Sequence, residues 1–93
     1  MVRIILAQEF EKQYQRLPLS IQKRAEKQTD IFSENPFHPS LHSEKLQIKR
    51  KQLWSLRVDK RYRVLFRFLE KNTALFLSIG PHDWIYKISL HRY

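Results

Sequence analysis

Two consecutive strands are expected from residues 53–68, which read LWSLRVDKRYRVLFRF. Apolar and polar side chains alternate on both sides of Asp59-Lys60, and a strand sends successive side chains to opposite faces. The pattern therefore predicts strands over 53–58 and 61–70, joined by a turn at Asp59-Lys60. The apolar face would carry Trp54, Leu56, Val58, Tyr62, Val64, Phe66 and Phe68. The other face would carry Ser55, Arg57, Arg61, Arg63, Leu65 and Arg67. We expect this second face to be open and to present its arginines to an RNA backbone.

The segments around this hairpin complete an α+β pattern. A β-branched apolar run predicts a strand over 2–7, and helical spacing predicts helices over 8–16 and 19–34, separated at Pro18 and ended by Asn35-Pro36. Residues 37–52 are expected to be irregular and basic. A further strand over 73–81 follows a turn at Lys71-Asn72, and a short helix ends the chain. The order β-α-α-β-β-β(-α) predicts a single domain over 1–93, with a four-stranded antiparallel or mixed sheet packed on a helix pair.

The charge of the chain predicts a polyanionic partner. The 93 residues include 18 Lys and Arg against 9 Asp and Glu, a formal net charge of +9. Nucleic acid is the first candidate partner, and an anionic membrane surface or an acidic protein is the second.

Cysteine usage and hydropathy limit the other classes. The absence of cysteine excludes a disulfide scaffold, a thiolate nucleophile and a cysteine zinc site, and it fits a reducing cytoplasm. There is no apolar run long enough to cross a bilayer, and the first residues lack the features of a signal peptide. We therefore expect a cytoplasmic protein without a membrane partner.

Two segments resemble the RelE/ParE toxin superfamily, and more closely its RelE/StbE branch. Residues 46–64 are similar to the family's strand pair, K-L-x-G…L-W-x-L-R-V…Y-R-V. Residues 77–86, LSIGPHDWIY, are similar to its ending, I-G-x-H/R-x-x-x-Y. The Pro18 junction and the helix-helix-meander order also agree, so the resemblance spans nearly the whole chain. The family's glycine in K-L-x-G is missing near Ile48, which predicts a different loop shape.

The resemblance implies a toxin of a type II toxin–antitoxin pair that cuts mRNA, usually on the ribosome, without a metal or cofactor. In such a reaction the 2′-hydroxyl attacks the adjacent phosphate, which requires a proton acceptor, phosphate stabilisation and a proton donor. Carried over by motif position, Arg57 and Arg63 would bind and stabilise the scissile phosphate. His82 would be a general acid or base, and Tyr86 a second proton carrier or a platform for base stacking.

Some positions depart from the family pattern. Some relatives carry lysine where Ser55 stands, and others carry arginine where His82 stands. Histidine at this position suggests imidazole acid–base chemistry, with Asp83 either orienting the ring or capping the helix. Each candidate also has a structural interpretation: the arginines could be solvated surface residues, and Tyr86 could simply pack against the fold.

The remaining basic residues are candidates for RNA binding. They are Lys45, Lys49, Arg50, Lys51, Arg61 and Arg67. A solvated loop is the alternative interpretation of the run around residue 50. His38 and His42 lack the spacing of a helical metal pair, so we expect no metal site.

Two other functions remain open at this point. A ParE-like chain would share the fold but inhibit DNA gyrase through protein contacts, and an inactive relative would only bind RNA or its antitoxin. All three hypotheses, the ribonuclease included, imply a cognate antitoxin that wraps the toxin with a partly disordered segment. Four apolar residues are expected to be exposed and to receive that segment, namely Phe37, Leu41, Ile85 and Ile88.

Overall fold

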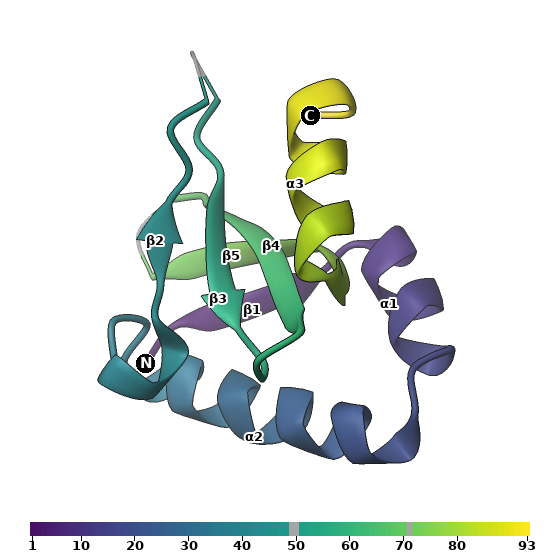
Figure 1. Ribbon diagram of the computed structural model, residues 1–93. Helices are drawn as coiled ribbons and strands as arrows, with labels where there is room; N and C mark the ends of the chain where they lie inside the picture. Colours follow the sequence, from purple (N-terminus) through teal and green to yellow (C-terminus); the bar gives the residue numbers. More distant parts are fainter. Residues whose placement is uncertain (49–50, 71) are drawn as a thin grey trace.

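The computed structural model describes residues 1–48, 51–70 and 72–93. Its elements, shown in Figure 1, are β1 (Arg3–Leu6), α1 (Gln8–Gln15), α2 (Leu19–Glu34), the 3-10 helix η1 (Pro39–Leu41), β2 (Glu44–Lys45), β3 (Trp54–Arg57), β4 (Tyr62–Phe68), β5 (Thr73–Pro81) and α3 (His82–His91). In the described residues, five strands form one sheet in the order β1-β5-β4-β3-β2. Strand β1 runs parallel to β5, and the other pairs are antiparallel.

The predicted α+β fold is confirmed, with one strand more than expected. The extra strand is β2, which lies inside the segment predicted to be irregular and pairs with β3 through Glu44↔Ser55 and Lys45↔Trp54. A strand of two residues is too short to show an alternating pattern, so no pattern in the sequence predicts it. It adds an edge to the sheet beside the predicted hairpin.

The first two helices follow local sequence signals closely. Helix α1 ends at Gln15, before Pro18, which precedes α2 and cannot lie inside a helix. Helix α2 ends at Glu34 and is capped by Asn35, whose backbone is extended and whose N–H donates to the carbonyl of Ile31. Pro36 explains this stop, because a residue before proline is disfavoured in helical conformation.

These two helices cover one face of the sheet. Phe10 of α1 and Phe32 of α2 pack against Phe66 and Phe76, which belong to the central strands β4 and β5. Their ring centroids are 5.0–5.7 Å apart in tilted or edge-to-face arrangements, which aromatic quadrupoles favour. This cluster is the principal core and confirms the predicted apolar face.

The opposite face was predicted to be open, and this prediction is wrong. Helix α3 folds back across β4 and β5 and covers it (Figure 1). Leu65 of β4 is completely buried there, together with Leu53, Leu77, Ile85 and Ile88. The spacing of Ile85 and Ile88 puts both on one side of α3, where they cover the apolar part of this sheet face.

The burial of this face also corrects the predicted antitoxin-docking residues. Leu41, Ile85 and Ile88 are buried, and Phe37 alone of the four is exposed, at 57%. These four residues therefore do not form an exposed apolar patch that could receive an antitoxin segment. No helix in the described part of the chain is long and apolar enough to cross a membrane.

Candidate active site at the start of helix α3

The site forms where the face covered by α3 changes from apolar to polar. Arg57 of β3 lies opposite Arg63 of β4, and Arg63 lies opposite Gly80 of β5. Residues opposite each other in a sheet point to the same face, so the two arginines stand side by side. The adjacent row contains Glu44, Ser55 and Leu65. Beyond it the same face carries the apolar contacts to α3.

Gly80 allows α3 to pack close to the arginines. A Cβ atom built on Gly80 would lie 2.7 Å from Cζ3 of Trp84, in the first turn of α3. This separation is shorter than any normal carbon contact, so a larger residue would push the helix away. The absence of a side chain thus brings the start of α3 onto the row that holds Arg57 and Arg63.

Neither arginine forms an ion pair with a carboxylate in the described part of the chain. Nη1 of Arg63 donates to the carbonyl oxygens of Asp59 (2.7 Å) and Tyr62 (3.0 Å), both neutral groups. Burial and the neighbouring charge of Arg57 lower the pKa of the Arg63 guanidinium. Nε of Arg57 is buried and has no hydrogen-bond partner. Two adjacent cations with spare donors form a site for an anion.

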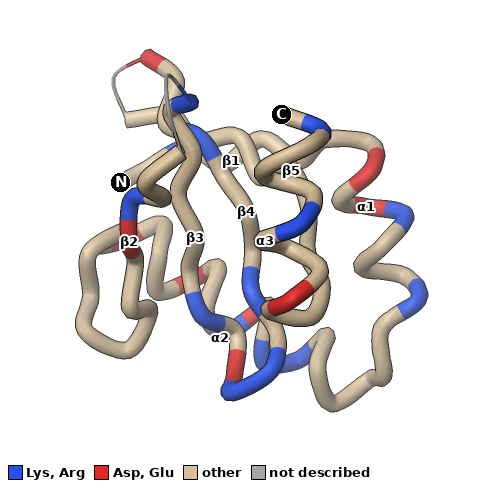
Figure 2. Tube along the Cα trace, turned by 45° about the horizontal axis from the view of Figure 1, so that its top comes forward, with Lys and Arg blue, Asp and Glu red and all other residues tan. Residues whose placement is uncertain are grey.

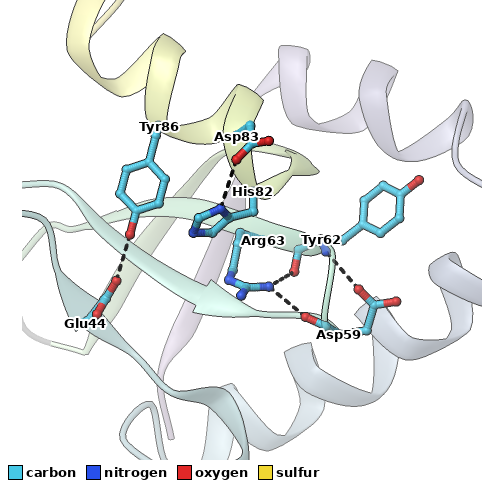
Figure 3. Close-up of polar contacts among 7 residues, drawn as sticks. All are labelled: Glu44, Asp59, Tyr62, Arg63, His82, Asp83 and Tyr86. Atoms are coloured by element: carbon cyan, nitrogen blue, oxygen red, sulfur yellow. Dashed lines mark hydrogen bonds and ion pairs between the residues drawn. The ribbon is translucent and has the colours of Figure 1, made fainter.

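The β3–β4 turn holds the backbone beside these arginines in place. Oδ1 of Asp59 accepts hydrogen bonds from the backbone N–H groups of Arg61 and Tyr62, both at 2.8 Å. An aspartate that bonds to the backbone two residues ahead is typical of tight turns. The turn predicted at Asp59-Lys60 is therefore confirmed, and its carboxylate is directed to the backbone rather than to Arg63 (Figure 3).

His82 opens α3 directly after the end of β5. Its backbone N–H donates to the carbonyl of Arg61 at 2.7 Å, which fixes the helix start to the β3–β4 turn. The imidazole remains 44% exposed and lies edge-on to the Tyr86 ring, with centroids 4.6 Å apart. Nδ1 is 3.3 Å from Oδ1 of Asp83, an almost fully exposed carboxylate. His82 and Arg63 line one surface pocket of about 480 Å³.

Tyr86 connects the helix to the edge strand β2. One turn after His82, its hydroxyl donates to Oε1 of Glu44 at 3.1 Å (Figure 3). Burial and this hydrogen bond raise the pKa of the Tyr86 hydroxyl, which the positive charge of Arg63 partly opposes. The phenol therefore stays protonated at neutral pH.

Glu44 is the site residue that the sequence interpretation missed. It lies in the segment predicted to be irregular, and the pairing of β2 with Ser55 brings its carboxylate onto the face with the arginines. Ser55, where some relatives carry lysine, is buried, so this position offers no exposed polar group. Glu44 is identified by its hydrogen bond to the distant Tyr86, and no local sequence motif points to it.

The structure thus brings together the four predicted catalytic residues. Arg57 and Arg63 are neighbours across two strands, Arg63 and His82 line one pocket, and His82 touches Tyr86. Figure 3 shows the side chains of Arg63, His82 and Tyr86 coming to this region from β4 and α3.

The predicted RNA-binding residues are more scattered. Arg61 lines the same pocket as His82, and Lys45 is exposed on β2. Nζ of Lys51 donates to the carbonyls of Ser89 and Leu90, so this lysine caps the end of α3. Arg67 is half-buried, with Nε unpaired. Lys49 and Arg50 lie outside the described residues.

Comparisons with known proteins agree with this architecture. A family model described as HigB-like toxin, the RelE-like toxin of the type II toxin–antitoxin system HigB, matches residues 5–82. No curated protein matches the sequence.

Solved structures share the fold at low sequence identity. The RelBE2 toxin–antitoxin complex of Mycobacterium tuberculosis has a chain with a TM-score of 0.73 at 17% identity, covering 87% of this chain and 98% of that one. The archaeal RelE–RelB complex of Pyrococcus horikoshii gives 0.71 at 23% identity, covering 86% and 93%. The YoeB/ParE toxin of Agrobacterium tumefaciens gives 0.72 at 15% identity, covering 87% and 99%.

The fold and the family match together define the class as RelE-like toxins of type II toxin–antitoxin systems. Within that class, the chain belongs to the HigB-like toxin family.

Proposed function

We propose that residues 1–93 form a single toxin domain that acts in the cytoplasm as an endoribonuclease on mRNA, engaged with the ribosome. The observation that carries this proposal is the Arg57–Arg63 pair, which adjoins His82 and Tyr86. Neither arginine forms an ion pair with a carboxylate in the described part of the chain. Two cations beside two groups that can carry protons match the needs of phosphodiester cleavage. A cognate antitoxin, as in the RelE–RelB complexes of similar fold, would neutralise the toxin.

The side chains of the site supply each step of the reaction. The 2′-hydroxyl passes its proton to the Tyr86 oxygen as the phenol proton moves to Glu44, along the existing hydrogen bond. The 2′-oxygen then attacks phosphorus, while Arg57 and Arg63 stabilise the negative charge that develops on the phosphate oxygens. As the bond from phosphorus to the 5′-oxygen breaks, protonated His82 donates its proton to that oxygen. The products are a 2′,3′-cyclic phosphate and a 5′-hydroxyl, and no step requires a metal.

The test is to express the wild type and the double variant Arg63→Ala/His82→Ala in growing cells and to map new 5′ ends of mRNA within minutes. The wild type should create new 5′-hydroxyl ends, and the variant should lose about 10²-fold or more of this activity. The matched control is Arg16→Ala/His91→Ala, which removes the same two residue types at exposed positions outside the site.

Other outcomes contradict the proposal. Growth arrest that is equally strong in the wild type and the Arg63/His82 variant, without new mRNA ends, would reject the nuclease hypothesis and favour a ParE-like target such as gyrase. The absence of arrest would favour an inactive relative that only binds RNA or antitoxin.

A further inference from the structure

A second basic pocket lies beyond the β3–β4 turn, on the side of α2. Its volume is about 470 Å³, and three segments build it: α2, the chain around η1, and the turn itself. The charged and imidazole residues that line it are Arg24, Lys27, His38, His42, Arg57, Asp59 and Lys60. Figure 1 shows the β3–β4 turn directly above α2, and Figure 2 shows Lys and Arg positions gathered around this turn. Of the four catalytic candidates, Arg57 lines this pocket, whereas Arg63 and His82 line the other one.

Hydrogen bonds hold the walls of this pocket together. Nε2 of Gln28, on α2, donates to the carbonyl of Ser40 at 3.1 Å and to the carbonyl of Arg57 at 2.8 Å. One side chain therefore joins all three segments. The fully buried Leu41 anchors η1 from below. The pocket is thus a built feature of the fold rather than a gap between unconnected loops.

The groups in the pocket suit a phosphate. Arg24, Lys27 and Lys60 supply positive charge, while the one carboxylate, that of Asp59, is engaged by the backbone N–H groups of the turn. Nδ1 of His38 accepts from the N–H of Ser40, so the ring proton lies on Nε2 and is free to donate. No Trp, Tyr or Phe is among the described residues that line the pocket, so a stacked base has no aromatic platform there.

The pocket continues from the candidate active site. Lys60 lines both this pocket and the one that contains Arg63 and His82. A polymer with regularly spaced phosphates can occupy both pockets by crossing the turn, and such a polymer is a nucleic-acid strand. Resting on the proposed ribonuclease function, we propose that this second pocket binds a backbone phosphate of the same RNA strand, near the phosphate that is cleaved.

The decisive experiment measures RNA binding apart from cleavage. The probe is a short, fluorescein-labelled single strand with 2′-O-methyl groups, which the toxin cannot cut because the nucleophile is blocked. The variant Arg24→Ala/Lys27→Ala is compared with the control Lys12→Ala/Lys23→Ala, which removes the same charge from exposed helix positions outside the pocket. All four substitutions place alanine in a helix, where its propensity is highest, so both variants should fold.

The expected result is a loss of affinity in the pocket variant alone. Anisotropy should show about tenfold weaker binding near 0.1 M salt. The slope of log K against log salt should fall by about 0.7, the contribution of one single-strand phosphate contact. The control should change by about twofold or less. In a spectrum of ¹⁵N-labelled imidazoles, the RNA should shift the signals of His38 and His42 as well as that of His82.

Other results overturn the inference and can be told apart from failure of the proposed function. Equal affinity of the two variants, with shifts at His82 alone, would reject the second pocket while leaving the nuclease intact. If the pocket variant binds RNA normally but loses binding of a poly-glutamate peptide, the pocket serves an acidic protein instead. A loss of RNA binding in the pocket variant, combined with cleavage that survives Arg63→Ala/His82→Ala, would reject the proposed site while supporting the RNA pocket.

Discussion

Replacing Gly80 by alanine should destabilise the protein by forcing α3 away from the sheet. The added Cβ would lie 2.7 Å from Cζ3 of Trp84 and closer still to Cε3, below any normal carbon contact. Gly80 is buried and Trp84 is half-buried, so relief requires the indole or the whole helix start to move. Overpacking of this kind costs about 2 kcal/mol. In a domain of this size, that corresponds to a fall in Tm of roughly 10 °C.

A double-mutant cycle assigns this cost to the indole ring. Urea unfolding would be measured for the wild type, Gly80→Ala, Trp84→Leu and the double variant. With the ring removed, Gly80→Ala should cost less than about 0.5 kcal/mol, giving a coupling free energy of about 1.5 kcal/mol. An equal cost of Gly80→Ala in both backgrounds would refute the reasoning. Because His82 follows Gly80 by two positions, Gly80→Ala should also reduce RNA cleavage under conditions in which the variant is still folded.

Three further measurements test the packing and the charges. Leu65→Ala should lower the free energy of unfolding by about 2–5 kcal/mol. Leu69→Ala, at a leucine that is 45% exposed, should change it by less than about 0.5 kcal/mol. Equal effects of the two substitutions in urea unfolding would mean that α3 does not bury Leu65. Burial, aided by Glu9 and opposed by Ser78, raises the pKa of the Tyr93 hydroxyl, so the folded state keeps this proton at a pH where the unfolded state has lost it. Stability should therefore be retained below about pH 10 and fall as the pH rises through the folded-state pKa, and Tyr93→Phe should flatten this dependence; an unchanged slope contradicts it. Arg67→Met should raise stability by about 1 kcal/mol, because it removes a buried Nε that lacks a partner, and a clear loss of stability would show that the guanidinium is satisfied.

Local signals in the sequence predicted most of the fold. The bounds of α2 and β5 agree with the residues expected, because Pro18 and Asn35-Pro36 limit the helix and apolar residues mark the strand. The meander was also predictable, since Asp59 and Asn72 are turn residues, and Asn72 adopts a positive φ of 56°.

What the sequence did not reveal depends on contacts between distant residues. The pattern of α3 showed an apolar side but not which surface it would cover, so the sheet face around Leu65 was wrongly predicted to be open. A register shift at Leu65/Phe66 lets Phe76 and Ile79, three positions apart, face the same core. Such a bulge changes the alternation without any local signature.

The candidate site, too, was predicted where local motifs mark it and missed where distant residues meet. Arg57, Arg63, His82 and Tyr86 were named from motif positions, and the structure brings them together. Glu44 could not be named, because a two-residue strand carries it and its hydrogen bond to Tyr86 joins residues far apart in the sequence. Lys51 was assigned to RNA, but no sequence pattern could show that its ammonium binds the last carbonyls of α3.

The parallel pairing of β1 with β5 delays the completion of the fold during synthesis. Arg3 is synthesised well before Thr73, its partner in the sheet. Strand β1 therefore stays unpaired until β5 has been made, and a long loop must close before that contact forms. The candidate site depends on the same late segments, since His82 and Tyr86 follow β5 directly. A nascent chain would thus lack its candidate site until β5 and α3 have both been made, even though β1 and the first two helices precede them by many residues.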